Sequence, residues 1–283
     1  DLRMSRGLGD VYKRQHKKTF DYIFNKTEAI TLEQSKLTLS KDITVLSFSD
    51  SSMVDRNSSI IKVDSGWIVY SKNSESSILS FTSDGQFSGY IGHRGNGPGE
   101  YTSVYDVVVN QKSKVLEVLS DGGIFCYTFG GDFLDKKEVT YPAFSFAIDD
   151  RQNYWFYVGN NTTYGDAKMI CTDENIANVA YYLHQKSNML PMVENNFGRN
   201  GEWLTFHESL NHDLYTIENG KLDLSYAMDF PNYKLPKKLH ELSGMEVIEE
   251  LQRSNYASII NYLENHDYIF LNCLLYTSDA ADE

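Results

Sequence analysis

The sequence predicts an all-β fold, a β-propeller of four-stranded antiparallel blades. Turn residues that close a hairpin recur about every 45 residues, at positions 85, 131, 175 and 220. Short apolar-rich stretches of strand length precede and follow each of these turns. The chain also contains 20 Tyr and 15 Phe among its 283 residues, and aromatic side chains favour pleated, half-buried surfaces. A unit of this size buries its faces only against its neighbours, as propeller blades do.

The first unit spans residues 59–92. An Ser65-Gly66 turn separates its first two strands, and Asp84-Gly85 is a hairpin signal between its last two. The four predicted strands are 59–64, 67–72, 78–81 and 86–91.

The same order of strands recurs three more times, in units at 104–139, 144–185 and 196–230. The second unit has predicted strands at 106–110, 115–119, 124–129 and 133–139. In the third unit they are 144–149, 154–158, 168–172 and 176–184. In the fourth they are 196–199, 203–207, 213–217 and 222–230.

Two further strand-like stretches flank these units. Residues 259–272 look like the start of a fifth, partial blade. Residues 43–48 precede the first unit as a leading strand without a blade of its own. In propellers such a strand often completes the last blade and closes the ring.

One amphipathic helix is predicted between the fourth and fifth units, over residues 236–253. Pro236 suits a first helical turn, and Gly244 weakens the middle. Apolar residues recur every three positions, at Leu239, Leu242, Met245, Ile248 and Leu251. The insertion either forms a lid over the propeller face or fills space by packing.

Both ends of the chain resemble translated sequencing-adapter DNA. Residues 10–15 can be encoded by GAT GTG TAT AAG AGA CAG, and the complementary strand, shifted by one base, encodes residues 273–278. This inverted repeat is similar to the mosaic end of transposase adapters. We therefore expect residues 1–15 and 273–283 to be non-native and exclude them from fold reasoning. The native part, 16–272, is then an incomplete fragment.

Gly92–Tyr101 carries the motif Gly-Asn-Gly-Pro-Gly-Glu-Tyr at the junction of the first two units. It resembles the GxGPGEY signature of bacterial six-bladed β-propeller proteins of the NHL and TolB type, many of them predicted lipoproteins of unknown role. The resemblance covers about residues 30–272 and implies six blades, of which about four and part of a fifth are present. It also implies a lipid anchor in the full-length protein and a location in the cell envelope, in the periplasm or at the outer membrane.

The glycine-rich motif has two interpretations. Its exposed N–H groups can cradle an anion, although no Gly-Lys-Ser/Thr follows as in a P-loop. As a structural element it is a shaped connection between blades, which Glu100 and Tyr101 anchor through hydrogen bonds.

Charge and cysteine content narrow the range of partners. The net charge of −13 is spread along the chain and repels phosphate backbones, so nucleic acid is not expected as a partner. Without the end segments only Cys126 and Cys171 remain, and we expect both to be buried thiols. No apolar run reaches the roughly 18 residues of a transmembrane segment.

A candidate ligand face follows from propeller topology. Loops between blades and loops between second and third strands lie on one side, around the channel mouth. We expect this face to collect hydrogen-bonding and aromatic side chains suited to a saccharide or a peptide. They are His93, Arg94, Glu100, Asn161, Tyr164 and His207.

Catalytic and metal-binding patterns are absent from the sequence. It contains no H-x-x-x-H, H-E-x-x-H or C-x-x-C, and no G-x-S-x-G, so no metal, cofactor or catalytic residue is predicted. The expected function is non-catalytic ligand binding or scaffolding. The alternative is a propeller lyase or hydrolase acting on a polysaccharide or a small lactone. An enzyme needs carboxylates or an ion at the channel mouth, whereas a binding protein needs aromatics and amides there.

Overall fold

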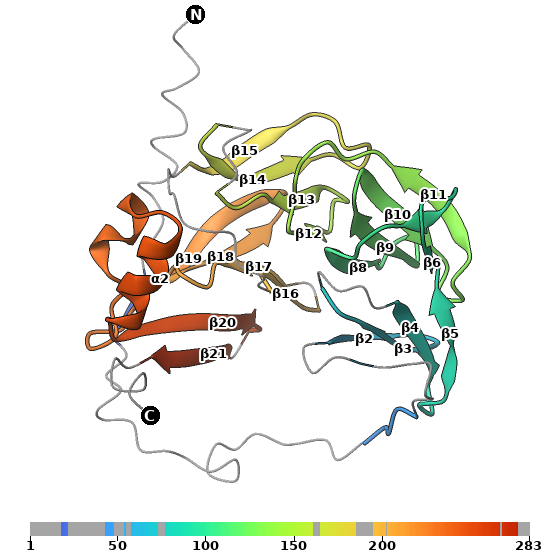
Figure 1. Cartoon of the computed structure of the whole chain (residues 1–283), viewed down its shortest axis with the longest axis horizontal. Coiled ribbons are helices and arrows are strands. Elements are labelled where there is room, and N and C mark those ends of the chain that lie inside the picture. Colours follow the sequence, from blue (N-terminus) through green and yellow to red (C-terminus); the bar gives the residue numbers. More distant parts are fainter. Residues whose placement is uncertain are drawn as a thin grey trace, which may run out of the picture.

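Four antiparallel sheets stand around a common axis, which confirms the predicted propeller (Figure 1). The computed structural model describes residues 18–21, 43–47, 54, 58–72, 77–160, 165–184, 195–201, 203–266 and 268–276. In each sheet the strand nearest the centre of the ring is the first in sequence: β2 (Ser59–Val63), β8 (Asp106–Asn110), β12 (Ser145–Ile148) and β16 (Phe197–Asn200).

Each sheet is a meander in which every strand pairs antiparallel with the next one outwards. The first sheet continues with β3 (Gly66–Tyr70), β4 (Ile78–Thr82) and β5 (Phe87–Ile91). The second continues with β9 (Val115–Ser120), β10 (Gly123–Tyr127) and β11 (Phe133–Lys137). The third adds β13 (Tyr154–Tyr157), β14 (Ala167–Thr172) and β15 (Ala180–His184), and the fourth adds β17 (Trp203–His207), β18 (Asp213–Glu218) and β19 (Lys221–Asp229).

The outer hairpins locate the repeat, with one correction. Gly85 and Gly131 take positive φ angles of 89° and 99° and donate their N–H groups to Thr82 and Thr128 three residues earlier. In the third sheet the equivalent residue is Ile176, with φ 57° and an N–H bond to the carbonyl of Asp173, and not position 175. The sequence did not indicate a turn residue at position 176, because a β-branched residue such as isoleucine rarely adopts positive φ.

The hydrophobic core consists of separate clusters between neighbouring sheets. One cluster joins Ile68 of the first sheet to Val118 of the second, and another joins Ile124 of the second to Phe156 of the third. A third joins Trp155 of the third sheet to Phe206 of the fourth. Each blade is therefore buried by the blades beside it, as the repeat predicts.

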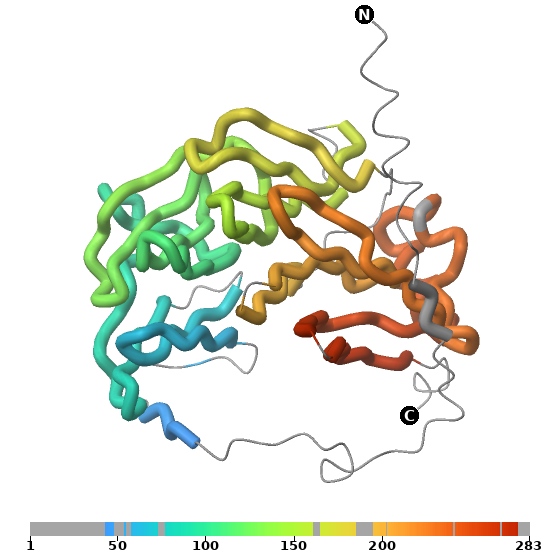
Figure 2. Tube along the Cα trace, turned by 180° about the vertical axis from the view of Figure 1, so that it is seen from behind, coloured from blue at the N-terminus to red at the C-terminus, as the bar shows by residue number. Residues whose placement is uncertain are grey.

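The fifth unit is a hairpin of β20 (Tyr256–Glu264) and β21 (Ile269–Tyr276), packed against the fourth sheet (Figure 2). β20 begins three residues before the predicted start of the partial blade. The last four residues of β21 fall in the segment ascribed to adapter DNA, and their origin stays a prediction. Residues 1–15 and 277–283 lie outside the described residues.

Two segments that precede the first blade differ from expectation. β1 (Lys18–Asp21) pairs in parallel with β19 and extends the fourth sheet to five strands. Residues 43–47 form no strand beyond a single bridge between Ser47 and Gln86, and Leu46 packs on the free face of the first sheet. Phe48, the last residue of the predicted leading strand, lies outside the described residues.

The predicted helix over 236–253 is divided into two. A 3₁₀ helix (Lys237–Glu241) precedes α2 (Met245–Gln252), because Gly244 at φ 56° and ψ −127° interrupts the helical backbone. Three residues of the predicted apolar stripe, Leu239, Leu242 and Leu251, pack in one cluster with the buried Val247, whereas Met245 of that stripe is 66% exposed. Leu210 and Leu235 also pack in this cluster, so the insertion fills space beside the fourth sheet.

Within the described part of the chain, no helix combines the length and the apolar character that a bilayer crossing requires.

Candidate functional site in the central channel

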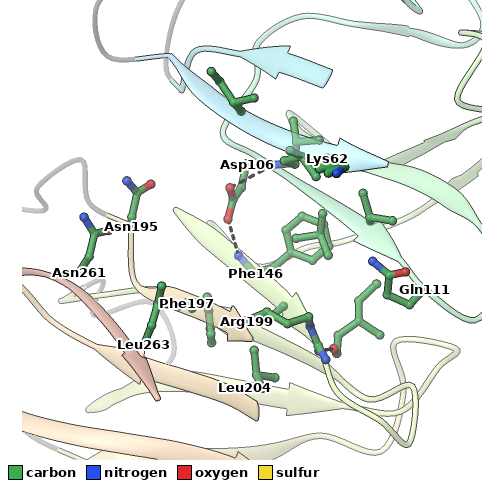
Figure 3. Close-up of a pocket in the computed structure, with 18 of the residues that line it drawn as sticks. Lys62, Asp106, Gln111, Phe146, Asn195, Phe197, Arg199, Leu204, Asn261 and Leu263 are labelled. Carbon is green, nitrogen blue, oxygen red and sulfur yellow. Dashed lines mark hydrogen bonds between the residues drawn. The ribbon is translucent and has the colours of Figure 1, made fainter. Parts of the chain in front are cut away.

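A cavity of about 880 Å³ lies between the inner strands of the ring (Figure 3). β2, β8, β12 and β16 contribute its walls, and Asn261, Tyr262 and Leu263 of β20 close one side. The first strand of each blade is its innermost strand, so each of the four repeats contributes a short stretch of chain to the lining of the cavity. Propeller channels are common ligand sites because equivalent strands converge there.

At one end of the cavity, the Asp106 carboxylate bonds to groups from neighbouring blades. Its Oδ1 lies 2.9 Å from Lys72 Nζ and accepts a 3.3 Å bond from the Tyr70 hydroxyl, while its Oδ2 accepts a 3.1 Å bond from the Phe146 amide. The carboxylate thus ties the first three blades together. Burial, and next the neighbouring Asp106 charge, raise the pKa of Tyr70 well above its usual value.

Basic side chains mark the other end. Lys62 lies on β2, with its ammonium 5.3 Å from the centre of the Trp67 ring, and Arg199 lies on β16, where it donates to the Ile148 carbonyl. Desolvation lowers the pKa of Arg199, and the charges of Asp149 and Asp150 oppose that shift.

A smaller cavity of about 330 Å³ continues the channel at this end. It shares Gln111 and Arg199 with the larger cavity and adds Lys112, Asp149 and Asp150. Asp149 is already occupied, because Oδ2 accepts bonds from Trp155 Nε1 at 3.0 Å and from Asn153 Nδ2 at 2.9 Å. The smaller cavity is therefore lined by one hydrogen-bonded carboxylate, Asp149, and one exposed carboxylate, Asp150.

Besides the charged residues, the lining of the cavity includes three residues with side-chain amides and four aromatic residues. They are Gln111, Asn195, Asn261, Tyr70, Phe146, Phe197 and Tyr262. Amide groups both donate and accept hydrogen bonds. Tyr70, Phe146 and Tyr262 are buried in the core, whereas Phe197 is half-buried and leaves part of its flat apolar surface accessible.

The glycine-rich loop lies away from this cavity. His93 and Arg94 form β6 (His93–Arg94), which pairs in parallel with β7 (Glu100–Tyr101) at the outer rim in Figure 1. Both side chains are exposed, and neither they nor Glu100 line the channel.

Hydrogen bonds anchor this loop between the first two blades. Glu100 Oε2 accepts a 2.8 Å bond from the Gly97 amide, and the buried Tyr101 hydroxyl donates to the Ile91 carbonyl at 3.2 Å. The bonds that the structural interpretation requires are therefore present.

His207 is also separate from the channel. His207 ends β17 and is buried, its pKa is lowered first by burial, and neither ring nitrogen makes a hydrogen bond of good geometry within the described residues. Asn161 and Tyr164 lie outside the described residues. The six predicted ligand residues thus stay a prediction about the loop face.

Sequence reasoning missed the channel residues, although a signal was present. Lys62, Asp106 and Arg199 are charged residues inside predicted first strands. In a propeller the first strand lines the axis, so a charged residue there faces either the channel or a neighbouring blade. Reading the first strands as one set would have found all three. Among the described residues, no group of three or more His, Cys, Asp or Glu side chains is arranged to hold a metal ion.

Comparisons with known proteins support the fold. The profile of a family described as "Domain of unknown function (DUF4934)" matches residues 11–281. A solved structure of a "putative exported protein" from Bacteroides fragilis NCTC 9343 is 16% identical, with a TM-score of 0.69 over 84% of this chain and 72% of that chain.

Two further solved structures are more distant. A member of the DUF4221 family from Bacteroides vulgatus is 10% identical, with a TM-score of 0.49 over 83% of this chain and 82% of that one. A streptogramin B lyase is 15% identical, with a TM-score of 0.45 over 80% of this chain and 70% of that one. No curated protein matches.

Proposed function

Because the chain belongs to the family described as Domain of unknown function (DUF4934), whose name assigns no activity, we propose a function from the structure: a non-catalytic binding propeller whose ligand is a saccharide held in the central channel. The observation that carries this proposal is the lining of the 880 Å³ cavity. It combines three amides with the half-buried ring of Phe197, and its one carboxylate, Asp106, is bound by Lys72, Tyr70 and two backbone amides.

A saccharide suits this lining better than a substrate for hydrolysis does. Sugar hydroxyls pair with side-chain amides, which donate and accept at once, and the apolar faces of sugar rings stack on aromatic side chains. Hydrolysis of a glycosidic bond requires two carboxyl groups at a defined separation, and the described lining provides no such pair.

The proposed location is the bacterial cell envelope, with a lipid anchor on the full-length protein. The resemblance of the glycine-rich motif to envelope propellers and the fold shared with a "putative exported protein" support it. Cell fractionation of the source organism, with an antibody against this chain, tests the location. Recovery in the cytosolic fraction would contradict it.

The binding proposal is tested by screening the labelled, purified chain against glycan and peptide arrays. Affinity for each hit is then measured by calorimetry for the wild type and for Asn195→Ala and Asn261→Ala. We expect each substitution to weaken saccharide binding by about tenfold, since losing a hydrogen bond to a bound polar group costs about 1–2 kcal/mol. Asn175→Ala, in an exposed outer hairpin, is the matched control and should bind normally.

Three results would contradict the proposal. Cleavage of the bound saccharide would favour the alternative, a lyase or hydrolase. Binding of peptides alone would correct the ligand class. Loss of binding on combined His93→Ala and Arg94→Ala substitution, with the channel variants unaffected, would move the site to the loop face.

A further inference from the structure

The channel carries an excess of positive charge in a protein of net charge −13. Lys72 and Asp106 neutralise each other at one end. At the other end three basic residues line the two connected cavities: Lys62, Lys112 and Arg199, called here the basic rim. Within the described residues none of the three has a carboxylate at ion-pair distance.

Strand register places two members of the basic rim at the same depth. Lys62 pairs with Trp67, one residue pair before the turn between β2 and β3. Arg199 pairs with Leu204, one residue pair before the turn between β16 and β17. Because inner strands of successive blades run in the same direction, both side chains lie at the end where first strands turn outwards. Figure 3 shows them on the same side of the cavity as Gln111, opposite Asn195 and Asn261.

Nearby carboxylates cancel this charge only in part, because four cations line the two cavities against the three carboxylates of Asp106, Asp149 and Asp150. Asp64 is paired with Lys114 at 3.2 Å, and Asp149 is bound by Trp155 and Asn153. Asp150 is the one exposed carboxylate in the lining of the smaller cavity. Lys112 and Arg199 line the same cavity as Asp150, and Lys62 lines the larger one. A guanidinium can bind a carboxylate through two parallel hydrogen bonds.

We propose that the basic rim binds an anionic group of the ligand, so that the channel selects acidic saccharides containing uronic acid over neutral ones. This inference rests on the proposed function. The amides at the opposite end would contact neutral hydroxyls, while Lys62 and Arg199 hold the carboxylate. All three side chains of the basic rim are exposed, so salt screens their contact with the carboxylate.

The test compares trigalacturonate with galactotriose, its neutral counterpart of the same length, by calorimetry on the whole chain. At low salt we expect trigalacturonate to bind at least about tenfold more tightly, because a hydrogen bond to a charged group contributes about 1.5–3 kcal/mol. Lys62→Gln and Arg199→Gln should each remove about that factor for trigalacturonate and leave galactotriose unchanged. The preference should also shrink as salt increases.

Lys114→Gln is the matched control, since Lys114 lies at the same end of the molecule but is paired with Asp64 and does not line the cavities. Unchanged thermal unfolding of each variant shows that the fold is retained. Equal affinity for both sugars, or rim variants that bind trigalacturonate normally, overturns the inference. If Asn195→Ala still weakens both sugars in that case, the proposed function stands while the preference for acid falls. If neither sugar binds, the inference falls and the array screen decides the proposed function.

Discussion

Two buried carboxylates, those of Glu117 and Glu208, form hydrogen bonds across blade interfaces, and each accepts one from a tyrosine hydroxyl. Glu117, which is 0% exposed, accepts a 2.8 Å bond from the Tyr154 hydroxyl of the next blade. Glu208 accepts from Tyr157 at 2.8 Å and from Lys168 at 3.0 Å. A buried carboxylate is tolerated only where such partners replace water, so these contacts fix how each blade sits on its neighbour.

The two buried cysteines give a prediction at this scale. Burial, before any other cause, raises the pKa of Cys126 and Cys171 from 9.0 to about 12. Since the thiolate is the reactive form, iodoacetamide at pH 8 should leave both unmodified in the folded chain and modify both in guanidinium chloride. Peptide mass mapping reads the result, and the partly exposed Cys273 is the internal control.

The same shift predicts a pH dependence. The pKa of each thiol is higher in the folded chain than in the unfolded one. The contribution of each thiol to stability is therefore complete below about pH 9 and is lost progressively as the pH rises towards 12. Rapid labelling of either cysteine in the folded chain would show that its blade interface is open.

Residue types alone predicted burial of these thiols but not the channel site. Cysteine is apolar enough to be buried in most settings. A charged residue such as Lys62 or Arg199 can face the channel, a neighbouring blade or bulk water, and only the assembled ring distinguishes these positions. Asp106 shows the difficulty, because its partners Lys72 and Phe146 lie 34 and 40 positions away in sequence.

Individual elements were predicted well where local signals act alone. The strand 106–110 has the predicted bounds, and the turns at Gly85 and Gly131 are the expected hairpins. Ile176 was missed because tertiary packing holds it at positive φ against its own preference. The helical insertion was predicted in outline: Leu239, Leu242 and Leu251 of the predicted stripe pack inwards, whereas Met245 and Ile248 are exposed.

A matched pair of substitutions tests the observed face of the insertion. Leu239 is 1% exposed, so Leu239→Ala should lower the free energy of unfolding by about 2–5 kcal/mol. Met245 belonged to the same predicted stripe but projects into solvent, so Met245→Ala should change it by less than about 0.5 kcal/mol. Denaturant unfolding measures both. Equal losses of stability would show that Met245 is buried like Leu239, as the predicted stripe of one continuous helix requires.

At the scale of the whole molecule, each blade is stabilised by its contacts with the neighbouring blades. Gly198 of β16 lies against β20, where a Cβ would come within 2.4 Å of the Tyr262 carbonyl oxygen. The Thr205 hydroxyl donates to the same oxygen at 2.9 Å. The fifth unit therefore depends on a close backbone approach to the fourth sheet.

Gly198→Ala should consequently loosen the fifth unit alone. We expect faster hydrogen exchange in β20, a loss of about 1–3 kcal/mol in stability, and unchanged exchange in β9 and β10. Gly130→Ala is the control, because its nearest neighbour, Thr128 Oγ1, is at an ordinary 3.5 Å. Uniform acceleration across all sheets would show that the ring unfolds as one cooperative unit instead.

The sequence by itself determined the propeller fold, the order of its four described blades and most of the breaks between their strands, because hydrophobic period, turn chemistry and repeat length are local properties of the chain. The tertiary structure alone decided which side chains meet in the channel, that the glycine-rich loop lies at the outer rim, and that the insertion packs through Leu239 and Val247. These depend on the angle and depth at which one sheet stacks on the next, and contacts between residues far apart in sequence set that geometry.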